Sequence, residues 1–236
     1  SDTLRLSSFL KSPARKLTAD QKQLISLGRG LVREDVAGVL MDEPLTVIDP
    51  DLKFRLRRNL KEINEQYKTT LVYVTHDQNE AMTFADNIIV MDQGEIVQVG
   101  LPKDLFEKPR TTFVGYFIGS PAMNLFNSEI LSDNSIKFNN DTIKTKTDLS
   151  KIKDKNVKLG IRSEFIKIAT DQKENIVSVK VTRVEDFGNF KLITGKAGDL
   201  EIKSKVEREI PISTEELKLH LPAEKCCIYS NEMLVN

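Results

Sequence analysis

With 236 residues, of which 39% are apolar and 30% charged, the chain is long enough for one large or two modest soluble domains. Lysine plus arginine and aspartate plus glutamate number 35 each, so no overall charge favours nucleic acid or an anionic membrane surface. The sequence has no apolar run of the roughly 18 residues that span a bilayer, and no signal-peptide pattern. We therefore expect a soluble cytosolic chain that binds no nucleic acid.

Helix-type and buried-strand patterns alternate before residue 120. In chain order they are a helix over 50–68, a buried strand over 71–75, a charged helix over 77–85, and a strand over 88–91 that turns through 92–94 into a hairpin partner over 95–99. Strands that alternate with helices predict an α/β portion with a parallel sheet and right-handed crossovers.

Beyond Ser120-Pro121 the pattern changes to short β-branched or alternating runs separated by turn formers. These runs lie at 157–161, 176–181, 190–194 and 200–203. Their spacing predicts a small β-barrel. Residues 132–156 are rich in Asn, Asp, Lys and Thr, and we expect polar hairpins or mobile loops there. The adjacent Cys226 and Cys227 are expected to be packed thiols, neither disulfide-bonded nor zinc-bound.

Two acids and a histidine stand at the ends of apolar runs. Asp42 and Glu43 follow Val39-Leu40-Met41, and His76 follows the run at 71–75. A buried parallel strand can carry acids at its carboxyl end, where a ligand crevice opens. Phosphoryl-transfer enzymes use one acid there to hold the water shell of Mg²⁺ and another to orient the attacking water. The pattern predicts nucleotide hydrolysis; the alternatives are a solvated acid pair and a histidine that merely ends a strand.

The sequence also lacks an element that nucleotide hydrolysis needs. No G-x-x-x-x-G-K-[ST] phosphate loop occurs in these 236 residues, so none of them forms the usual cradle for the β and γ phosphates. The nearest approach, from Gly188 to Gly195-Lys196-Ala197, has two residues too many between its glycines and no hydroxyl after the lysine. That segment predicts hairpin turns.

On these residues the chain resembles the ATP-binding subunits of ABC transporters, in particular the sugar-importer type typified by the maltose transporter subunit. Asp42-Glu43 resembles the end of the Walker B strand, Thr46-Val47-Ile48-Asp49 the D-loop, and His76 the switch histidine. Leu17-Thr18-Ala19-Asp20-Gln21 stands where the family has its LSGGQ signature. The order and spacing of the four elements carry the resemblance. It implies an incomplete P-loop NTPase portion, with a parallel sheet and helices.

The resemblance implies a role for each matching position. Asp42 would help hold Mg²⁺, Glu43 would act as general base or water-orienting group, and His76 would contact the γ-phosphate. Asp49 would reach across a dimer interface. The nucleotide of the opposite subunit would be met by Thr18, Ala19, Asp20 and Gln21. The cofactors implied for the complete protein are ATP and Mg²⁺.

The tail carries the same resemblance. Residues 94–102 and 117–124 resemble the stretch that joins the ATPase domain to its accessory barrel in sugar importers. Leu159-Gly160-Ile161-Arg162-Ser163-Glu164 resembles the LGIRPE segment of that barrel, with Ser163 in place of proline. These matches imply an ATPase portion over 1–119 and a TOBE domain, a small all-β OB-like barrel, over 120–236. The alternative is a generic β-domain.

The signature-like segment departs from the family pattern. Ala19 and Asp20 replace glycines that allow close backbone approach. Asp20 also places a negative charge where phosphate binds, and two like charges about 4 Å apart repel by roughly 1 kcal/mol in water and about 4 kcal/mol at a surface-like dielectric. Thr18 and Gln21 still form a capping box, so a helix should begin here. Because the strand-end acids and His76 match, we expect a heterodimer with one competent and one degenerate site.

The resemblance also implies an assembly. The partners would be transmembrane permease subunits, a second ATPase subunit and an extracytoplasmic solute-binding protein, and the chain would lie on the cytoplasmic face of the cell membrane during uptake of a sugar or polyol-type solute. The opening Ser1-Asp2-Thr3-Leu4-Arg5-Leu6 resembles the segment just before the signature. We therefore expect a truncated chain or gene fragment, inactive alone, with a natural half-domain as the alternative. Other functions left open are a non-catalytic regulatory or dimerisation module and a soluble ABC ATPase acting on DNA or ribosomes.

Overall fold

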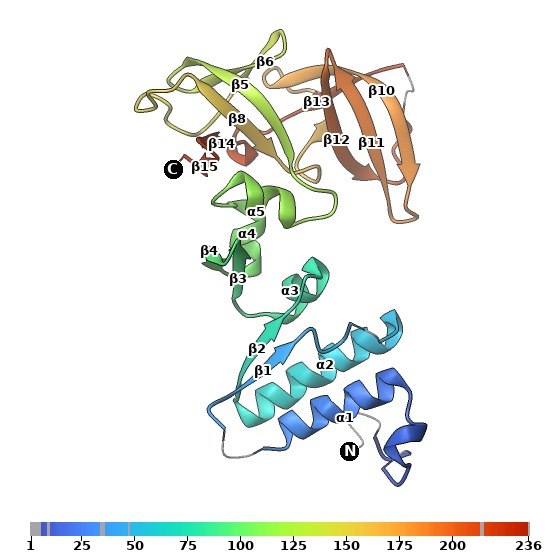
Figure 1. Cartoon of the computed structure of the whole chain (residues 1–236). Coiled ribbons are helices and arrows are strands. Elements are labelled where there is room, and N and C mark those ends of the chain that lie inside the picture. Colours follow the sequence, from blue (N-terminus) through green and yellow to red (C-terminus); the bar gives the residue numbers. More distant parts are fainter. Residues whose placement is uncertain (1–5, 9, 34–35, 47, 213–214, 236) are drawn as a thin grey trace. The chain divides into compact units, whose positions relative to one another are not determined.

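The structure is a computed structural model of the whole chain that describes residues 6–8, 10–33, 36–46, 48–212 and 215–235 (Figure 1). The opening residues Ser1 to Arg5 and Val47 of the D-loop-like segment lie outside the described residues. Contacts within the chain divide it into two units, Ser1–Asp86 and Asn87–Asn236, which are described separately.

Unit 1 is built on a parallel pair of strands, β1 (Gly38–Asp42) and β2 (Thr70–Val74), with Asp42 opposite Val74. Its helices are the 3-10 turn η1 (Ala14–Lys16), α1 (Ala19–Leu31), α2 (Pro50–Tyr67) and α3 (Gln78–Phe84). The predicted strand-helix alternation and parallel pairing are confirmed over this unit. Helix α2 begins where Asp49 accepts a hydrogen bond from the Leu52 amide, and Pro50 stands in its first turn.

One face of the β1–β2 pair packs against the helices. The core of unit 1 consists of Leu6, Leu24, Leu27, Met41, Leu45, Ile48, Leu56 and Leu60. Leu40, Val72 and Val74 lie on exposed positions of the two strands, and Leu40 is 80% exposed. Side chains alternate between the faces of a strand. The second face of the pair is therefore apolar and left open to solvent within this unit.

Unit 2 begins with the predicted hairpin, β3 (Ile88–Asp92) and β4 (Glu95–Gly100), which turns at Gln93-Gly94 with both residues at positive φ. A short turn at positive φ is the geometry that suits a hairpin. Two short helices follow, α4 (Pro102–Glu107) and α5 (Thr112–Phe117). The regular elements in the remainder of the unit are strands and one 3-10 turn.

Eleven named strands beyond residue 120 form two sheets. They are β5 (Asn124–Ser132), β6 (Ser135–Phe138), β7 (Asp141–Lys144), β8 (Asn156–Ile161), β9 (Lys167–Ile168), β10 (Ile176–Asp186), β11 (Phe190–Ala197), β12 (Leu200–Glu207), β13 (Glu216–His220), β14 (Cys227–Ser230) and β15 (Met233–Leu234), with a 3-10 turn η2 (Ala223–Lys225). One sheet runs β12-β11-β10-β13-β9 and the other β15-β14-β8-β5-β6-β7. The predicted all-β portion is confirmed, and the polar stretch after 132 contains the β6–β7 hairpin.

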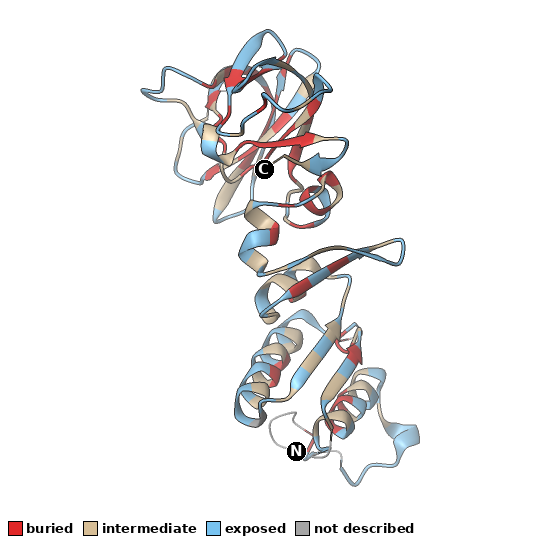
Figure 2. Cartoon of the chain, turned by 90° about the vertical axis from the view of Figure 1, so that its left-hand side faces the viewer, coloured by how far each residue is buried: buried red, intermediate tan, exposed pale blue. Residues whose placement is uncertain are grey.

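Both sheets share one apolar core. It contains Phe126, Phe138, Leu159, Val177, Val179, Ile202, Leu219 and Ile228, among others, and Figure 2 shows buried segments along the strands of both sheets. Cys226 and Cys227 are buried and unbridged, as expected. Burial raises the pKa of the Cys226 thiol to about 12, so this thiol stays protonated at neutral pH.

Arg162 joins the short helices of unit 2 to the end of β8. The residue is only 1% exposed, and its guanidinium donates to the carbonyl oxygens of Phe106 (3.0 Å), Gly115 (2.8 Å) and Ile118. The Cζ atom also lies 4.6 Å from the centre of the Phe106 ring. The last carbonyls of a helix have no partner within the helix. Arg162 therefore supplies donors to carbonyl groups at the ends of α4 and α5, and the Gly115 carbonyl also accepts from the Met123 amide at 3.3 Å.

Among the helices that the structure describes, none combines the length and the apolar character needed to cross a membrane.

Candidate functional site

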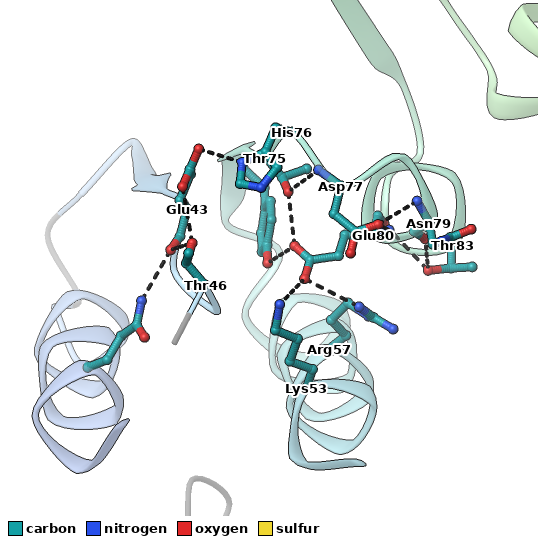
Figure 3. Close-up of polar contacts among 12 residues, drawn as sticks. Glu43, Thr46, Lys53, Arg57, Thr75, His76, Asp77, Asn79, Glu80 and Thr83 are labelled. Atoms are coloured by element: carbon teal, nitrogen blue, oxygen red, sulfur yellow. Dashed lines mark hydrogen bonds and ion pairs between the residues drawn. The ribbon is translucent and has the colours of Figure 1, made fainter. Parts of the chain in front are cut away.

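The structure brings Glu43 and His76 into direct contact. Each follows the carboxyl end of a strand of the parallel pair, where Asp42 lies opposite Val74, so both emerge at the same sheet edge. His76 Nδ1 lies 2.7 Å from Glu43 Oε1 (Figure 3). The two residues are 33 positions apart in sequence. An acid and a histidine that the sequence places at the ends of apolar runs thus meet at one edge, and their catalytic roles stay predictions.

Both side chains of the Glu43–His76 pair are accessible to a ligand. The His76 side chain is 72% exposed and that of Glu43 42%. The hydrogen bond with Glu43 raises the pKa of His76, and that same bond, followed by one from Thr46, lowers the pKa of Glu43. The contact thus favours the charged form of both groups, the Glu43 carboxylate and the His76 imidazolium.

The pair predicts a pH dependence for unit 1. Because the folded-state pKa of His76 lies above its unfolded value near 6.5, the stabilisation is complete below that value and is lost as pH rises through the folded pKa. Glu43 loses its contribution as pH falls through its lowered pKa. The effect on stability should be small, since solvent screens exposed pairs. An NMR titration checks it: His76 should titrate at a higher pH in the native sequence than in Glu43→Gln, and equal pKa values would contradict the contact.

The backbone of Glu43 has an uncommon conformation. Its φ is +44°, in the left-handed region, and a non-glycine residue held in such a region costs about 1–3 kcal/mol. Its amide donates to the Val74 carbonyl at 2.9 Å. Its carbonyl accepts from Gln23 Nε2 at 3.1 Å, and the Thr46 hydroxyl lies 3.0 Å from that carbonyl and 3.1 Å from Glu43 Oε2. Sequence reasoning missed Gln23, because no local pattern ties a helical glutamine to a distant carbonyl.

A buried carboxylate orders the segment that carries His76. Glu80 of α3 is only 4% exposed and accepts hydrogen bonds from Tyr73 (2.9 Å) and Thr75 (3.0 Å) (Figure 3). Lys53 Nζ and Arg57 Nη1 of α2 each lie 3.5 Å from its other oxygen. A buried acid is retained when it is paired and hydrogen-bonded. Glu80 thereby holds α2, α3 and the end of β2 together around His76.

The α3 helix starts directly after His76. Asp77 accepts hydrogen bonds from the amides of Asn79 (2.8 Å) and Glu80 (3.3 Å), and its own amide donates to the Thr75 hydroxyl at 3.0 Å. A residue that caps a helix fixes the direction in which the chain enters it. The backbone on both sides of His76 is therefore fixed, while its ring stays exposed.

The other two acids expected at the site have different surroundings. Asp42 is exposed at the last position of β1, beside Glu43 in sequence. The Asp49 side chain caps α2 through the Leu52 amide at 3.0 Å. Asp49 therefore has a local structural role in this chain, and the role across a dimer interface stays a prediction.

The signature-like residues Thr18, Ala19, Asp20 and Gln21 lie at the start of α1. Thr18 caps the helix, and its amide donates to Gln21 Oε1 at 3.1 Å, so the predicted capping box is present. The Thr18 hydroxyl donates to the Asp20 carboxylate, and this bond lowers the pKa of Asp20. Asp20 is consequently ionised at neutral pH. Its carboxylate accepts the hydrogen bond of the Thr18 hydroxyl, the group that the resemblance assigns to contact with a phosphate.

The residues at the sheet edge fit one end of a magnesium nucleotide. Among the described residues, no group of three or more His, Cys, Asp or Glu side chains gathers to hold a metal alone. Mg²⁺ is usually held by one or two carboxylates, water and substrate phosphate, and an exposed Asp42 beside Glu43 suits that arrangement. The donor chemistry of Asp42 and Glu43 is of the kind that Mg²⁺ with a phosphate uses, and the metal role of Asp42 stays a prediction.

Known proteins share both parts of this architecture. The family model of the MalK OB fold domain matches residues 119–166. The sn-glycerol-3-phosphate import ATP-binding proteins UgpC of Pectobacterium atrosepticum and Salmonella typhimurium are 35% and 36% identical to the chain over 233 residues, or 97% of it. The chain spans 64% and 65% of the length of these two relatives. The resemblance found in the sequence is confirmed: the chain is similar over nearly its whole length to ATP-binding proteins of ABC importers, and its residues 119–166 are similar to the MalK OB fold domain.

A solved structure of an ATP-binding cassette of an ABC transporter in its ADP conformation is also similar. It is 24% identical, covers 46% of this chain and 43% of its own, and has a TM-score of 0.40.

Proposed function

We propose that the complete protein is the ATP-hydrolysing subunit of an ABC importer and that unit 1 supplies the water-orienting and terminal-phosphate contacts of its site. The observation that carries this proposal is the 2.7 Å contact between Glu43 and His76 at the carboxyl edge of parallel strands. Support also comes from relatives named as import ATP-binding proteins. The solute is a sugar or a polyol-type compound, the class that contains the glycerol 3-phosphate of the relatives' names.

In this mechanism each exposed group at the edge has one task. The Glu43 carboxylate accepts a hydrogen bond from the attacking water and orients it. The His76 imidazole, held by Glu43 in the absence of nucleotide, turns its donor to the terminal phosphate oxygen and stabilises charge there. Asp42 holds water ligands of Mg²⁺, and the bound ion would neutralise charge on the phosphates.

The proposed assembly follows from the same function. The subunit binds transmembrane permease subunits at the cytoplasmic face of the cell membrane, pairs with a second ATPase subunit, and works with an extracytoplasmic solute-binding protein. The test is ATP hydrolysis by the polypeptide of the full reading frame, measured with and without Mg²⁺ and beside the 236-residue chain. Magnesium-dependent turnover by the longer polypeptide and none by the shorter chain is expected. A full-length product without turnover would contradict the proposal.

The altered signature favours a heterodimer in which α1 of this subunit faces the nucleotide site of its partner and weakens phosphate binding there. The Thr18 hydroxyl is bonded to the ionised Asp20, so neither group is suited to a phosphate. Restoring glycine with Ala19→Gly and Asp20→Gly should raise ATP turnover of the assembled transporter by about tenfold or more, since removing a 1.4 kcal/mol repulsion is worth tenfold in rate. Steady-state turnover measures this. Unchanged turnover would argue against the degenerate site.

The second candidate function is a non-catalytic regulatory or dimerisation module. The acid at Asp20 favours it, because a module that binds no nucleotide tolerates a charge at the start of α1. A reading frame limited to these 236 residues, with a folded chain that does not bind ATP, would support the module.

A further inference from the structure

The Glu43 carboxylate contacts His76 while the Glu43 backbone has the left-handed conformation. Glu43 has a φ of +44°, directly follows the last residue of β1 and stands directly before Pro44. A residue before proline is already restricted by the proline ring. Such a conformation persists only when neighbouring groups fix it. The groups that fix it therefore control where the carboxylate points.

The hydrogen bonds to this backbone come from three different elements. Val74, at the end of β2, accepts from the Glu43 amide. The amide of Thr46 donates to the Glu43 carbonyl at 3.3 Å, and its hydroxyl lies 3.0 Å from the same oxygen, both from within the turn itself. Gln23 Nε2, at 3.1 Å, is the contact that arrives from a helix, α1. Unlike Thr46, Gln23 belongs to an element outside the turn, so it can hold the turn in place.

The amide oxygen of Gln23, Oε1, indicates why this residue is a glutamine. Within the described part of the chain, Gln23 Oε1 is buried and has no hydrogen-bond partner. Turning the amide over would place that oxygen against the Glu43 carbonyl, so the donor must face Glu43. A buried polar atom left without a partner is unfavourable, and an apolar side chain of similar length would avoid it. Stability of α1 alone therefore gives no reason for an amide here.

We infer that Gln23 is a positioning residue that holds the Glu43 backbone in its left-handed conformation and thereby aims the Glu43 carboxylate at His76. This inference deepens the proposed function, because it concerns the side chain that orients water there. It also connects two parts of the chain that the resemblance treats separately. Gln23 lies one turn into the helix that starts at Thr18-Ala19-Asp20, so a displacement of α1 reaches Glu43 through one hydrogen bond.

The test uses Gln23→Met in the whole 236-residue chain. The chain has two histidines, so the imidazole signals of His76 and His220 can be followed separately by NMR. Methionine keeps the length and neutrality of glutamine but removes the donor. We expect His76 in Gln23→Met to lose more than half of the rise in pKa that Glu43→Gln abolishes. Amide exchange at Glu43 and Thr46 should become faster, while the remaining amides of β1 and β2 keep their protection.

Leu27→Ala is the matched control. Leu27 is buried in the same core on the same helix, and its substitution removes apolar contacts of α1 while the hydrogen bond from Gln23 to Glu43 stays in place. The control should leave the His76 pKa at its native value. The inference is overturned if Gln23→Met titrates like the native chain, if Leu27→Ala shifts His76 equally, or if native His76 already titrates like Glu43→Gln. These measurements use no nucleotide. An absence of ATPase activity would therefore contradict the proposed function without deciding whether Gln23 positions Glu43.

Discussion

Replacing Glu43 with glutamine is expected to lower the kcat for ATP in the full reading-frame product by roughly 10²–10⁴-fold, the range for loss of a positioned general base. Glutamine keeps the size of the side chain but cannot accept a proton from water. Binding of ATP should change little, because the carboxylate acts on the water and makes no binding contact in this mechanism. Steady-state turnover gives kcat, and equilibrium binding of ATP gives the affinity.

The control for this experiment is Glu62→Gln on α2. Glu62 pairs with Arg58 at 3.5 Å on the exposed face of that helix, and the proposed mechanism gives it no task. The same chemical change there should leave kcat unchanged. His76→Ala should reduce kcat as well, since it removes the group that stabilises charge on the terminal phosphate. A Glu43→Gln protein with native kcat would show that Glu43 is not the group that orients the water.

Arg162→Met is expected to lower the free energy of unfolding of unit 2 by about 1–3 kcal/mol, the cost of leaving a buried hydrogen-bonding group without its partner. The guanidinium donates to the carbonyl oxygens of Phe106, Gly115 and Ile118, and methionine would remove all three hydrogen bonds, although the Gly115 carbonyl would keep the Met123 amide as a donor at 3.3 Å. Arg162→Lys should rescue only part of the loss, because an ammonium lacks the planar fork that reaches several acceptors.

Native-state hydrogen exchange of the β8 and β14 amides measures the change. The two strands are paired, and Arg162 directly follows the last residue of β8. The control is Arg208→Met. Arg208 pairs with Asp186 at 3.1 Å, and both side chains are about half exposed, so the loss should stay below about 1 kcal/mol. An Arg162→Met protein as stable as the control would show that the helix carbonyls find other donors.

Sequence reasoning reached the parts of the site that depend on period and order. The strand-end position of Glu43 and His76 follows from apolar runs of strand length, because parallel neighbours end at the same edge. The capping box at Thr18 is likewise a local pattern that the structure reproduces. Local patterns are readable because the interacting residues are three or four positions apart.

The contacts that sequence reasoning missed are long-range. Gln23 reaches Glu43 across 20 positions, and Glu80 gathers Lys53 and Arg57 from another helix. A single sequence does not determine how its helices pack against its strands, so these long-range contacts can be identified only when the packing is known. The acid at Asp20 shows the opposite case: the departure was visible in the sequence, but its bond to the Thr18 hydroxyl was not.

The two separate cores have a practical consequence for every measurement of stability on this chain. The core of unit 1 draws on residues from Leu6 to Leu60, and the core between the sheets of unit 2 on residues from Phe126 to Ile228, with no shared member. Two independent cores need not melt together, so a calorimetric endotherm of this chain can contain two overlapping components. Tyr67 and Tyr73 lie in one unit and Tyr116 and Tyr229 in the other, so in a protein without tryptophan tyrosine signals assigned residue by residue can follow the two transitions.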